Sequence, residues 1–273
     1  MTTKSAPQEL YSDKYAHIEP LPDPPRVNDM EQFKSMVNTA ATLGYYFRNR
    51  NDVLVSGEGY LRRTAAPDEH GVFPDCVFAD GLEDPNAIIA RNGYVISEVG
   101  KPPDFVLEVA SRSTGRRDYT VKPAIYASFG ISEYWRFDHT GGLYHNAPLA
   151  GDELVDGEYR PIPIHRDEDG LIWGHSRVLG LDLCWFDKEL RFRAPATGAF
   201  LPTPSELADQ RDAAQAARNT AQAARNTAQA ARETAQVERE TAQVERDAER
   251  AGRLAAEAEV ARLREQLIRM QQD

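Results

Sequence analysis

Apolar and polar positions along the chain change their spacing several times, and each spacing predicts a different kind of element. Between Glu31 and Phe47, apolar side chains recur at helical intervals and predict a helix. The apolar stretch 53–63, which contains two glycines, predicts an interrupted strand, and a short strand is predicted over 75–79. The polar segment 82–101 is predicted to be a loop.

The clearest strand follows Pro103, where Phe, Val and Leu dominate as far as Ser111. A turn and a helix ending near Gly130 come next, and the run Glu-Tyr-Trp-Arg-Phe-Asp then predicts another strand. This alternation of helices and strands predicts a mixed α/β domain. Further strands are expected within 142–149, 157–164 and 179–186.

The last part of the chain, 205–273, contains no proline, no aromatic residue and a single glycine, which predicts a helix throughout. Its sequence repeats every seven residues, a pattern typical of a coiled coil. The seam of this repeat is rich in Ala and Thr, so each layer buries little apolar area and association should be weak. A single solvated helix is the alternative. The predicted seam positions are Ala213, Ala216, Thr220, Ala223, Thr227, Ala230, Thr234, Val237, Thr241, Val244, Ala248, Ala251, Ala255 and Ala258.

Composition divides the chain into three parts. Residues 1–28 are polar and rich in proline, and we expect them to form an arm outside the core. Residues 29–200 have the composition of a globular α/β domain, and 205–273 form the helical tail. Hydrophobic residues make up 41% of the chain, which is enough to build a core and excludes a wholly disordered protein.

The net charge of −11 argues against broad electrostatic contact with nucleic acid, because such contact normally needs a basic surface. It leaves open a site whose carboxylates bind a divalent cation, since the metal then supplies positive charge. Cys76 and Cys184 form no disulfide framework. The sequence shows neither a membrane-spanning segment nor a signal-peptide pattern, so we expect a soluble, cytoplasmic protein.

The common catalytic motifs of nucleotide-binding proteins, serine hydrolases and zinc proteases do not occur in the sequence. Cys76 lies in a predicted strand and is interpreted as a core residue. The histidines are scattered through polar segments and are interpreted as surface or turn residues; they occupy positions 17, 70, 139, 145, 165 and 175.

Three carboxylates stand out, because each lies at or inside a predicted strand. Asp75 and Asp104 each follow a proline at a strand start, and Glu108 lies four residues along the second of these strands. Strand alternation places Asp104 and Glu108 on one face. Burying Glu108 among apolar residues is costly unless it has a partner, for which a hard cation is one candidate. The alternative is an ion pair with a nearby arginine, namely Arg112, Arg116 or Arg117, with both aspartates merely capping their strands.

The order and spacing of these residues resemble the bacterial Uma-type family of restriction-endonuclease-like proteins, a branch of the PD-(D/E)XK nuclease superfamily. The resemblance covers roughly residues 29–186 and implies a restriction-endonuclease-like mixed sheet flanked by helices. Coiled-coil tails are common in this family. The matching positions are Pro74-Asp75, Glu108-Val109, Ser111, Ser113-Thr114, Arg117-Asp118, Lys122, Tyr126, Gly130-Ile131, Glu133-Tyr134-Trp135 and Asp138.

The resemblance implies that Asp75 and Glu108 bind a metal ion and that Lys122 acts on the attacking water. The superfamily motif has its lysine two residues after the glutamate, where this chain has Ala110. The family lysine lies on the following helix instead, at Lys122. Pro123 follows it directly and fits only the first turn of a helix, so Lys122 should stand at a helix start.

Three further residues are implied as supporting ones. Asp104 would act as a helper or a strand cap, and Ser111 belongs to the matching motif. Tyr126 would order the helix, contact a phosphate, or only pack. The sequence also departs from the family pattern at Arg112, which stands where the family usually has proline.

The function implied by the resemblance is hydrolysis of DNA phosphodiester bonds with Mg²⁺, or Mn²⁺ in its place. DNA is then the expected partner, together with a second copy or another helix along 205–273. The alternative is a catalytically inactive nuclease fold that serves as an interaction module through its coiled coil. Hydrolysis of RNA or of a nucleotide is a third interpretation, because the same site chemistry could perform it.

Overall fold

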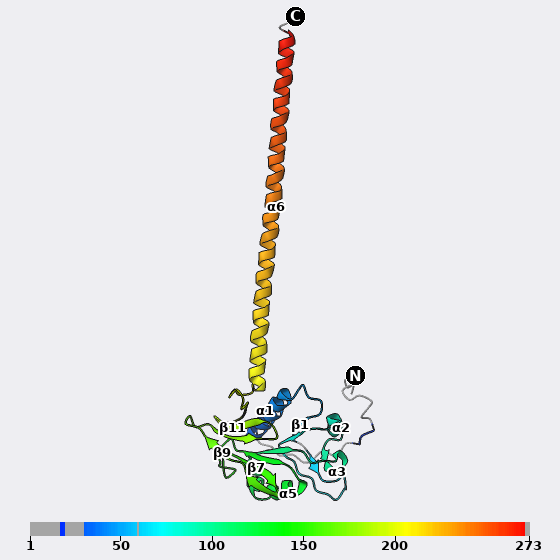
Figure 1. Cartoon of the computed structure of the whole chain (residues 1–273), viewed down its shortest axis with the longest axis vertical. Helices are drawn as coiled ribbons and strands as arrows, with labels where there is room; N and C mark the ends of the chain where they lie inside the picture. The colour runs from blue at the N-terminus through cyan, green and yellow to red at the C-terminus, as the bar shows by residue number, and fades with distance from the viewer. Residues whose placement is uncertain (1–16, 20–29, 59, 271–273) are drawn as a thin grey trace, which may run out of the picture. The chain divides into compact units, whose positions relative to one another are not determined.

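The computed structural model describes residues 17–19, 30–58 and 60–270, so most of the predicted arm 1–28 lies outside the described residues. The chain forms two compact units, residues 1–207 and 208–273. The first unit holds the three described sheets and the short helices, and the second consists of the long helix α6 (Pro204–Met270) after its first turn (Figure 1).

A six-stranded mixed sheet organises the first unit, with strand order β1-β3-β5-β6-β7-β8. Only β5 and β6 run parallel; the other neighbours are antiparallel. Every residue of β5 is buried, as expected of a central strand built from Phe, Val and Leu. The strands are β1 (Leu54–Gly57), β3 (Cys76–Ala79), β5 (Phe105–Val109), β6 (Glu133–Phe137), β7 (Leu149–Val155) and β8 (Glu158–Pro161).

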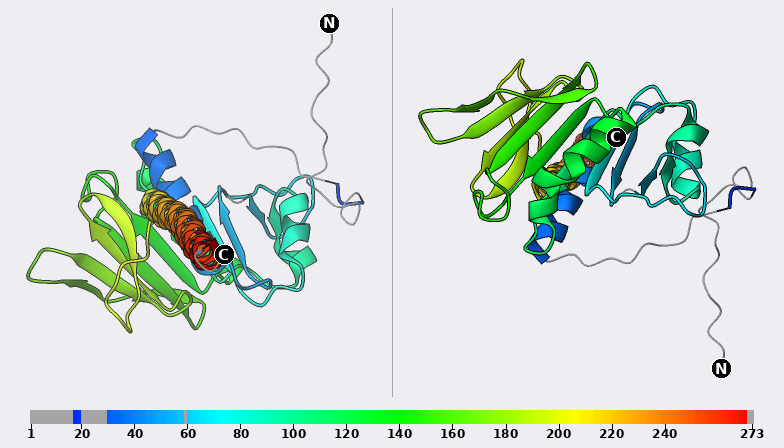
Figure 2. Two further views of the ribbon diagram at one scale, coloured as in Figure 1. Left: turned by 90° about the horizontal axis from the view of Figure 1, so that it is seen from above. Right: turned by 90° about the horizontal axis from the view of Figure 1, so that it is seen from below.

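Helices cover both faces of this sheet (Figure 2). On one face, α1 (Met30–Tyr46) packs Met36 and Leu43 into a core with Phe78 and Leu107. On the other face, Tyr126 of α5 (Lys122–Phe129) packs with Val106 of β5. The predicted helix 31–47 and the predicted strands at 75–79 and after Pro103 are confirmed.

A second sheet, with order β12-β11-β10-β9, packs against the first around Trp135. Gly151 and Gly174 let the indole approach closely, since a Cβ on either would lie 2.8 or 2.9 Å from its ring. The strands are β9 (Ile164–Arg166), β10 (Ile172–Ser176), β11 (Leu181–Phe186) and β12 (Glu189–Arg193).

Two sequence predictions were wrong. Segment 82–101 is not a loop: it contains α2 (Pro85–Ala90), β4 (Tyr94–Val95) and α3 (Ile96–Val99), and β4 pairs with β2 (Leu61–Arg62). These elements are too short for a periodic pattern, and contacts with the core stabilise them. The strand expected within 142–149 begins only at Leu149, because hydrogen bonds to Asp138 hold the preceding residues in a loop.

The connection between β5 and β6 contains two helices, α4 (Gly115–Thr120) and α5, separated at Val121. Pro123 occupies the first turn of α5, so the predicted placement of Lys122 at a helix start is confirmed. Gly130 ends α5 with a left-handed φ of 80°.

Helix α6 runs unbroken from Pro204 to Met270, which confirms the continuous helix predicted from composition. A reciprocal capping box begins it: Thr203 N donates to Glu206 Oε2 at 2.7 Å, and Glu206 N donates to Thr203 Oγ1 at 3.3 Å. Arg191 of β12 also contacts Glu206, at 3.0 Å. Among the described helices, none is long and apolar enough to cross a membrane.

This boundary predicts where the chain can be cut. A variant ending at Leu207 keeps the capping box and the Arg191–Glu206 pair, so its midpoint of thermal unfolding should match that of the first unit in the full chain. A variant ending at Pro202 loses both and should unfold about 2–4 °C lower, as expected for a loss of about 1 kcal/mol. Equal midpoints for the two variants in a circular dichroism melt would contradict the assigned boundary.

Candidate active site

Asp75 and Glu108 are cross-strand neighbours at one end of the large sheet. Cys76 pairs with Leu107 across the antiparallel β3–β5 ladder. Asp75 precedes Cys76 and Glu108 follows Leu107, so the two acidic residues lie opposite each other at the next position of the ladder. Directly opposite residues in such a ladder share a face, with Cβ atoms roughly 5 Å apart. Both carboxylates are buried, Asp75 with 7% and Glu108 with 1% of its surface exposed.

Hydrogen bonds from two elements hold the Asp75 carboxylate. Val109 N donates to Oδ2 at 2.7 Å, and Gln32 Nε2, from the first turn of α1, donates to the same oxygen at 3.1 Å. Gln32 also donates to the carbonyl of Val109 at 3.2 Å, so it ties α1 to the end of β5. Burial raises the pKa of Asp75 to about 6, although Lys122 and these hydrogen bonds act in the opposite direction.

Glu108 contacts two side chains of α5. Lys122 Nζ lies 2.7 Å from Oε2, and the Tyr126 hydroxyl donates to Oε1. Burial raises the pKa of Glu108 well above its usual value, and the charges of Asp75 and Asp118 add to this effect while Lys122 opposes it. The arginine pairing considered as an alternative for Glu108 is therefore wrong, because the partner is Lys122.

Lys122 also contacts a third buried carboxylate, Asp118 of α4, whose Oδ1 lies 2.8 Å from Nζ. Burial by itself lowers the pKa of Lys122, but Glu108 and Asp118 outweigh it, so the net pKa is raised and the ammonium stays charged. The other oxygen of Asp118 lies 3.0 Å from His145 Nε2. Asp118 and His145 are 0% and 3% exposed. His145 lies in a loop, as one of the two predicted roles required, but its burial shows that a surface role is wrong.

Asp138 holds the loop that carries His145. Its carboxylate accepts hydrogen bonds from the backbone amides of Thr140, Tyr144 and His145 at 2.7–2.8 Å, and from the Thr140 hydroxyl at 2.6 Å. Burial alone would raise the pKa of Asp138, but these donors outweigh it and the net pKa is lowered. The matching motif contained Asp118 and Asp138, yet no spacing in the sequence pointed to His145.

Asp104 and Ser111 lie apart from these contacts. Asp104 precedes β5 at the end opposite to Glu108; it accepts from Asp80 N at 2.8 Å and pairs with Lys101 at 2.7 Å. A role as a helper at the Glu108 end is therefore excluded by its position, and its contacts are those of a strand cap. Ser111 Oγ contacts Thr114 Oγ1 at 2.6 Å and accepts from Thr114 N, so it shapes the turn before α4.

The cluster of Asp75, Glu108, Asp118 and Lys122 suits a divalent cation on electrostatic grounds. Three buried carboxylates lie near one ammonium, which contacts Glu108 and Asp118, and burial raises the pKa of Asp75 and Glu108 although Lys122 acts in the opposite direction. No three His, Cys, Asp or Glu side chains of the described ranges form a metal-binding group. Mg²⁺ commonly binds through one or two carboxylates and otherwise through water or phosphate, which fits Asp75 and Glu108.

A family model described as "Uma2: Putative restriction endonuclease" matches residues 31–191, more than half of the chain. The chain belongs to the Uma2 family. The match runs from the first turn of α1 into β12 and so contains every residue of the cluster. None of the curated proteins matches the chain.

Solved structures also resemble this Uma2 protein. One is the crystal structure of a putative nuclease belonging to DUF820 from Anabaena variabilis ATCC 29413. It is 11% identical in sequence, with a TM-score of 0.37, and the match covers 53% of this chain and 75% of the other.

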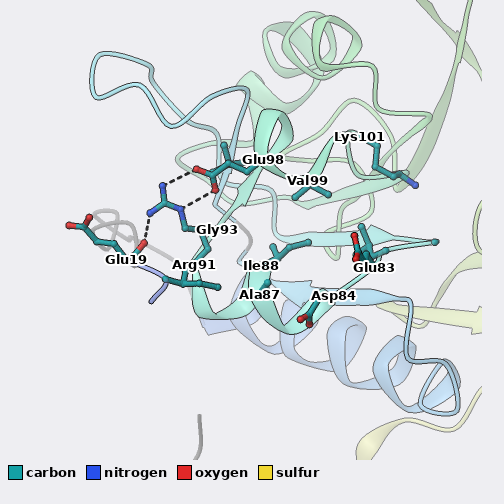
Figure 3. A pocket seen from close by; sticks show the side chains of 14 residues that line it. Glu19, Glu83, Asp84, Ala87, Ile88, Arg91, Gly93, Glu98, Val99 and Lys101 are labelled. Carbon is teal, nitrogen blue, oxygen red and sulfur yellow. Dashed lines mark hydrogen bonds and ion pairs between the residues drawn. The ribbon is translucent and has the colours of Figure 1, made fainter. Parts of the chain in front are cut away.

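A cavity of about 530 Å³ lies elsewhere in this Uma2 protein and shares no lining residue with the cluster. Leu82, Ile88 and Val95 contribute apolar surface to it. At its edge, Arg91 donates to both oxygens of Glu98 at 3.1 Å and to the carbonyl of Glu19 (Figure 3). This cavity and the buried polar cluster are thus separate features.

The contacts of Asp138 predict a pH-dependent effect on stability. Asp138→Asn should lower the free energy of unfolding by about 2 kcal/mol at pH 7, since several amide donors lose a charged acceptor. Because folding lowers the pKa of Asp138, its contribution is present above the unfolded pKa near 3.9 and is lost as pH falls through the folded value. The difference in free energy of unfolding between wild type and variant, measured by urea unfolding, should therefore be smaller at about pH 3 than at pH 7.

The exposed Asp156 provides the control. Asp156→Asn should change the free energy of unfolding by less than about 0.5 kcal/mol at either pH, because its side chain is 88% exposed. A gap for Asp138→Asn that is the same at pH 7 and pH 3 would show that the ionised carboxylate does not hold the loop.

Proposed function

We propose that this Uma2 protein is a metal-dependent endonuclease that hydrolyses DNA phosphodiester bonds. The observation that carries the proposal is the burial of Asp75, just before β3, opposite Glu108 of β5, whose carboxylate lies 2.7 Å from Lys122 Nζ of α5. Membership of a family of nuclease type supports this reaction class. Two carboxylates beside a lysine supply the groups that cation binding and water activation need.

Asp75 and Glu108 would hold Mg²⁺, with Mn²⁺ as an alternative. The bound cation would lower the pKa of water and offset charge on the reacting phosphate. Gln32 and the Val109 amide fix the orientation of the Asp75 carboxylate, and Tyr126 fixes that of Glu108. These donors leave each carboxylate in one rotamer, which reduces the reorganisation needed when a cation binds.

Lys122 would orient the attacking water and stabilise the negative charge that develops on the phosphate oxygens. Its ammonium stays protonated beside two carboxylates, so electrostatic stabilisation suits it better than proton abstraction. Ser111 would keep the turn before α4 in place. Asp104 takes no part in this scheme.

One observation favours the alternative of an inactive interaction module. The Lys122 ammonium lies between Glu108 and Asp118, only 15% of its side chain is exposed, and it occupies the Glu108 oxygen that a cation would use. In that interpretation the ion pairs are purely structural, and the tail carries the function.

We propose that 205–273 associates with a second copy or with another helix. The structure of α6 supports a surface that can be covered: Thr220, Thr227, Thr234 and Thr241 each donate to the carbonyl four residues earlier, at 2.9–3.0 Å. Each of these seam hydroxyls already donates a hydrogen bond, so burying them under a partner helix leaves no donor unsatisfied. We also propose a reducing, cytoplasmic setting, supported by the free buried thiols of Cys76 and Cys184.

A cleavage assay tests the proposed activity. Plasmid DNA should be cut with Mg²⁺ or Mn²⁺ and poorly with Ca²⁺, whose looser coordination positions water less well. Glu108→Gln should reduce the rate by at least about 100-fold, since it removes a charged ligand while keeping the side-chain shape. Asp104→Asn is the matched control and should cut at the wild-type rate. Single-stranded DNA and RNA in parallel reactions identify the substrate.

Cleavage by Glu108→Gln at the wild-type rate would place the chemistry elsewhere. No cleavage of any of the three substrates by the wild-type protein, with every cation, would favour the inactive module.

Sedimentation tests the proposed association of the tail. Sedimentation at tens of micromolar should show the full chain as an oligomer and the variant ending at Leu207 as a monomer, because only the full chain carries the seam. The Ala- and Thr-rich layers bury little area, so the oligomer should dissociate on dilution or mild heating. Monomers in both samples would support the single solvated helix.

A further inference from the structure

We infer that Asp118 and His145 are positioning residues that hold the Lys122 ammonium at the Glu108 carboxylate. The inference rests on the role of Lys122 in the proposed function. It concerns a carboxylate–histidine pair whose two members come from α4 and from the loop after β6.

A lysine needs such support more than most side chains, because its four-carbon stem has many rotamers and its ammonium has no preferred direction. Lys122 starts α5 and its Nζ lies 2.7 Å from Glu108 Oε2. One contact fixes a distance and leaves the ammonium free to swing around Glu108. The second contact, 2.8 Å to Asp118 Oδ1, removes that freedom.

Helix geometry alone does not provide the second contact. Asp118 and Lys122 are four residues apart, a spacing at which side chains meet on a continuous helix, but α4 ends at Thr120 and α5 begins at Lys122. Asp118 must therefore be held independently. Its Oδ2 lies 3.0 Å from His145 Nε2, so each carboxylate oxygen has one nitrogen partner.

The loop that carries His145 is itself fixed against α4. The backbone amide of His145 donates to Asp138 at 2.7 Å. Gly115, at the start of α4, lies so close to this loop that a Cβ would be 2.7 Å from the Tyr144 carbonyl oxygen. Only glycine permits this approach, so α4 and the loop pack directly against one another next to Asp118 and His145.

The burial of the His145 ring supports an oriented pair. His145 Nε2 lies 3.0 Å from Asp118 Oδ2, and the two residues are 3% and 0% exposed. Bulk water therefore does not compete for this contact. A histidine and a carboxylate in such contact orient one another, as they do around metal sites, so His145 directs Asp118 toward Lys122.

The test observes the ammonium itself in the full-length protein. A ¹H–¹⁵N spectrum of side-chain NH₃⁺ groups should contain one slowly exchanging signal that Lys122→Arg removes, because a fixed, buried ammonium exchanges slowly with water. Asp118→Asn and His145→Leu should each remove or broaden this signal. His145→Gln should restore it, since the glutamine amide can donate from the place of Nε2.

The second sheet offers a matched control. His175 Nδ1 lies 3.0 Å from Asp182 Oδ1, a pair of the same length far from Lys122 in the topology. His175→Leu should leave the Lys122 signal unchanged. The backbone amide spectrum reports folding of each variant, and His145→Asn, which is polar but too short to reach Asp118, replaces His145→Leu should that variant not fold.

Cleavage is measured beside the spectrum. His145→Leu should lower kcat about 10- to 100-fold with KM unchanged, and His145→Gln should recover most of the rate. A Lys122 signal that survives both Asp118→Asn and the loss of His145, or that the wild-type protein lacks, overturns the positioning role. A wild-type protein that shows the signal without cleaving nucleic acid overturns the proposed function and leaves the positioning role intact.

Discussion

One buried ammonium group largely determines how the first unit is built around its polar cluster. Lys122 contacts Glu108 and Asp118 within 2.8 Å, and a third carboxylate, Asp75, lies beside Glu108 in the sheet. Burying a carboxylate without a partner is costly, and removing one member of a buried pair exposes that cost. The same requirement therefore constrains every element that carries one of these charges. The helices α4 and α5, the start of β3 and the end of β5 must bring the three carboxylates close to the ammonium.

The surrounding elements meet this constraint through their backbone geometry. A new helix starts at Lys122 with Pro123 in its first turn, and Lys122 contacts Glu108 of β5. Gly115 lets α4 lie against the loop after β6, and Asp138 holds that loop through three backbone amides. Gln32 joins α1 to the same end of the sheet. Three segments distant in sequence, namely α1, the α4–α5 connection and the loop after β6, thus converge on one end of β5. Their polar contacts allow the charged cluster to be buried.

The two units depend on different physics. The first is stabilised by apolar burial between two sheets and their helices, in a core that includes Trp135, Phe78 and Leu107. The described side chains of 208–273 are exposed, so α6 has only helix propensity and i,i+4 contacts of its own, such as that of Gln229 with Glu233 at 3.0 Å. Contacts of this kind contribute a few tenths of a kcal/mol each. Any additional stability of the tail has to come from a partner.

Local pattern was sufficient for much of the fold. Helical spacing identified α1, apolar runs identified β3 and β5, the heptad repeat and missing prolines identified α6, and Pro123 located the start of α5. A resemblance in motif order then pointed to Asp75, Glu108 and Lys122. These features depend on neighbours within a few residues, which a sequence displays directly. Short elements such as α2 and β4 escaped because two to six residues carry no period.

Only the tertiary structure decided the partners. It paired Glu108 with Lys122 instead of an arginine, gave Asp104 the partners Lys101 and Asp80, and buried His145 against Asp118. His145 stands 27 residues from Asp118 in a polar stretch, where nothing local distinguishes it from a surface histidine. Burial and charge pairing are properties of segments that meet in space. Their energies depend on distance and on exclusion of water, and neither is defined before the chain has folded.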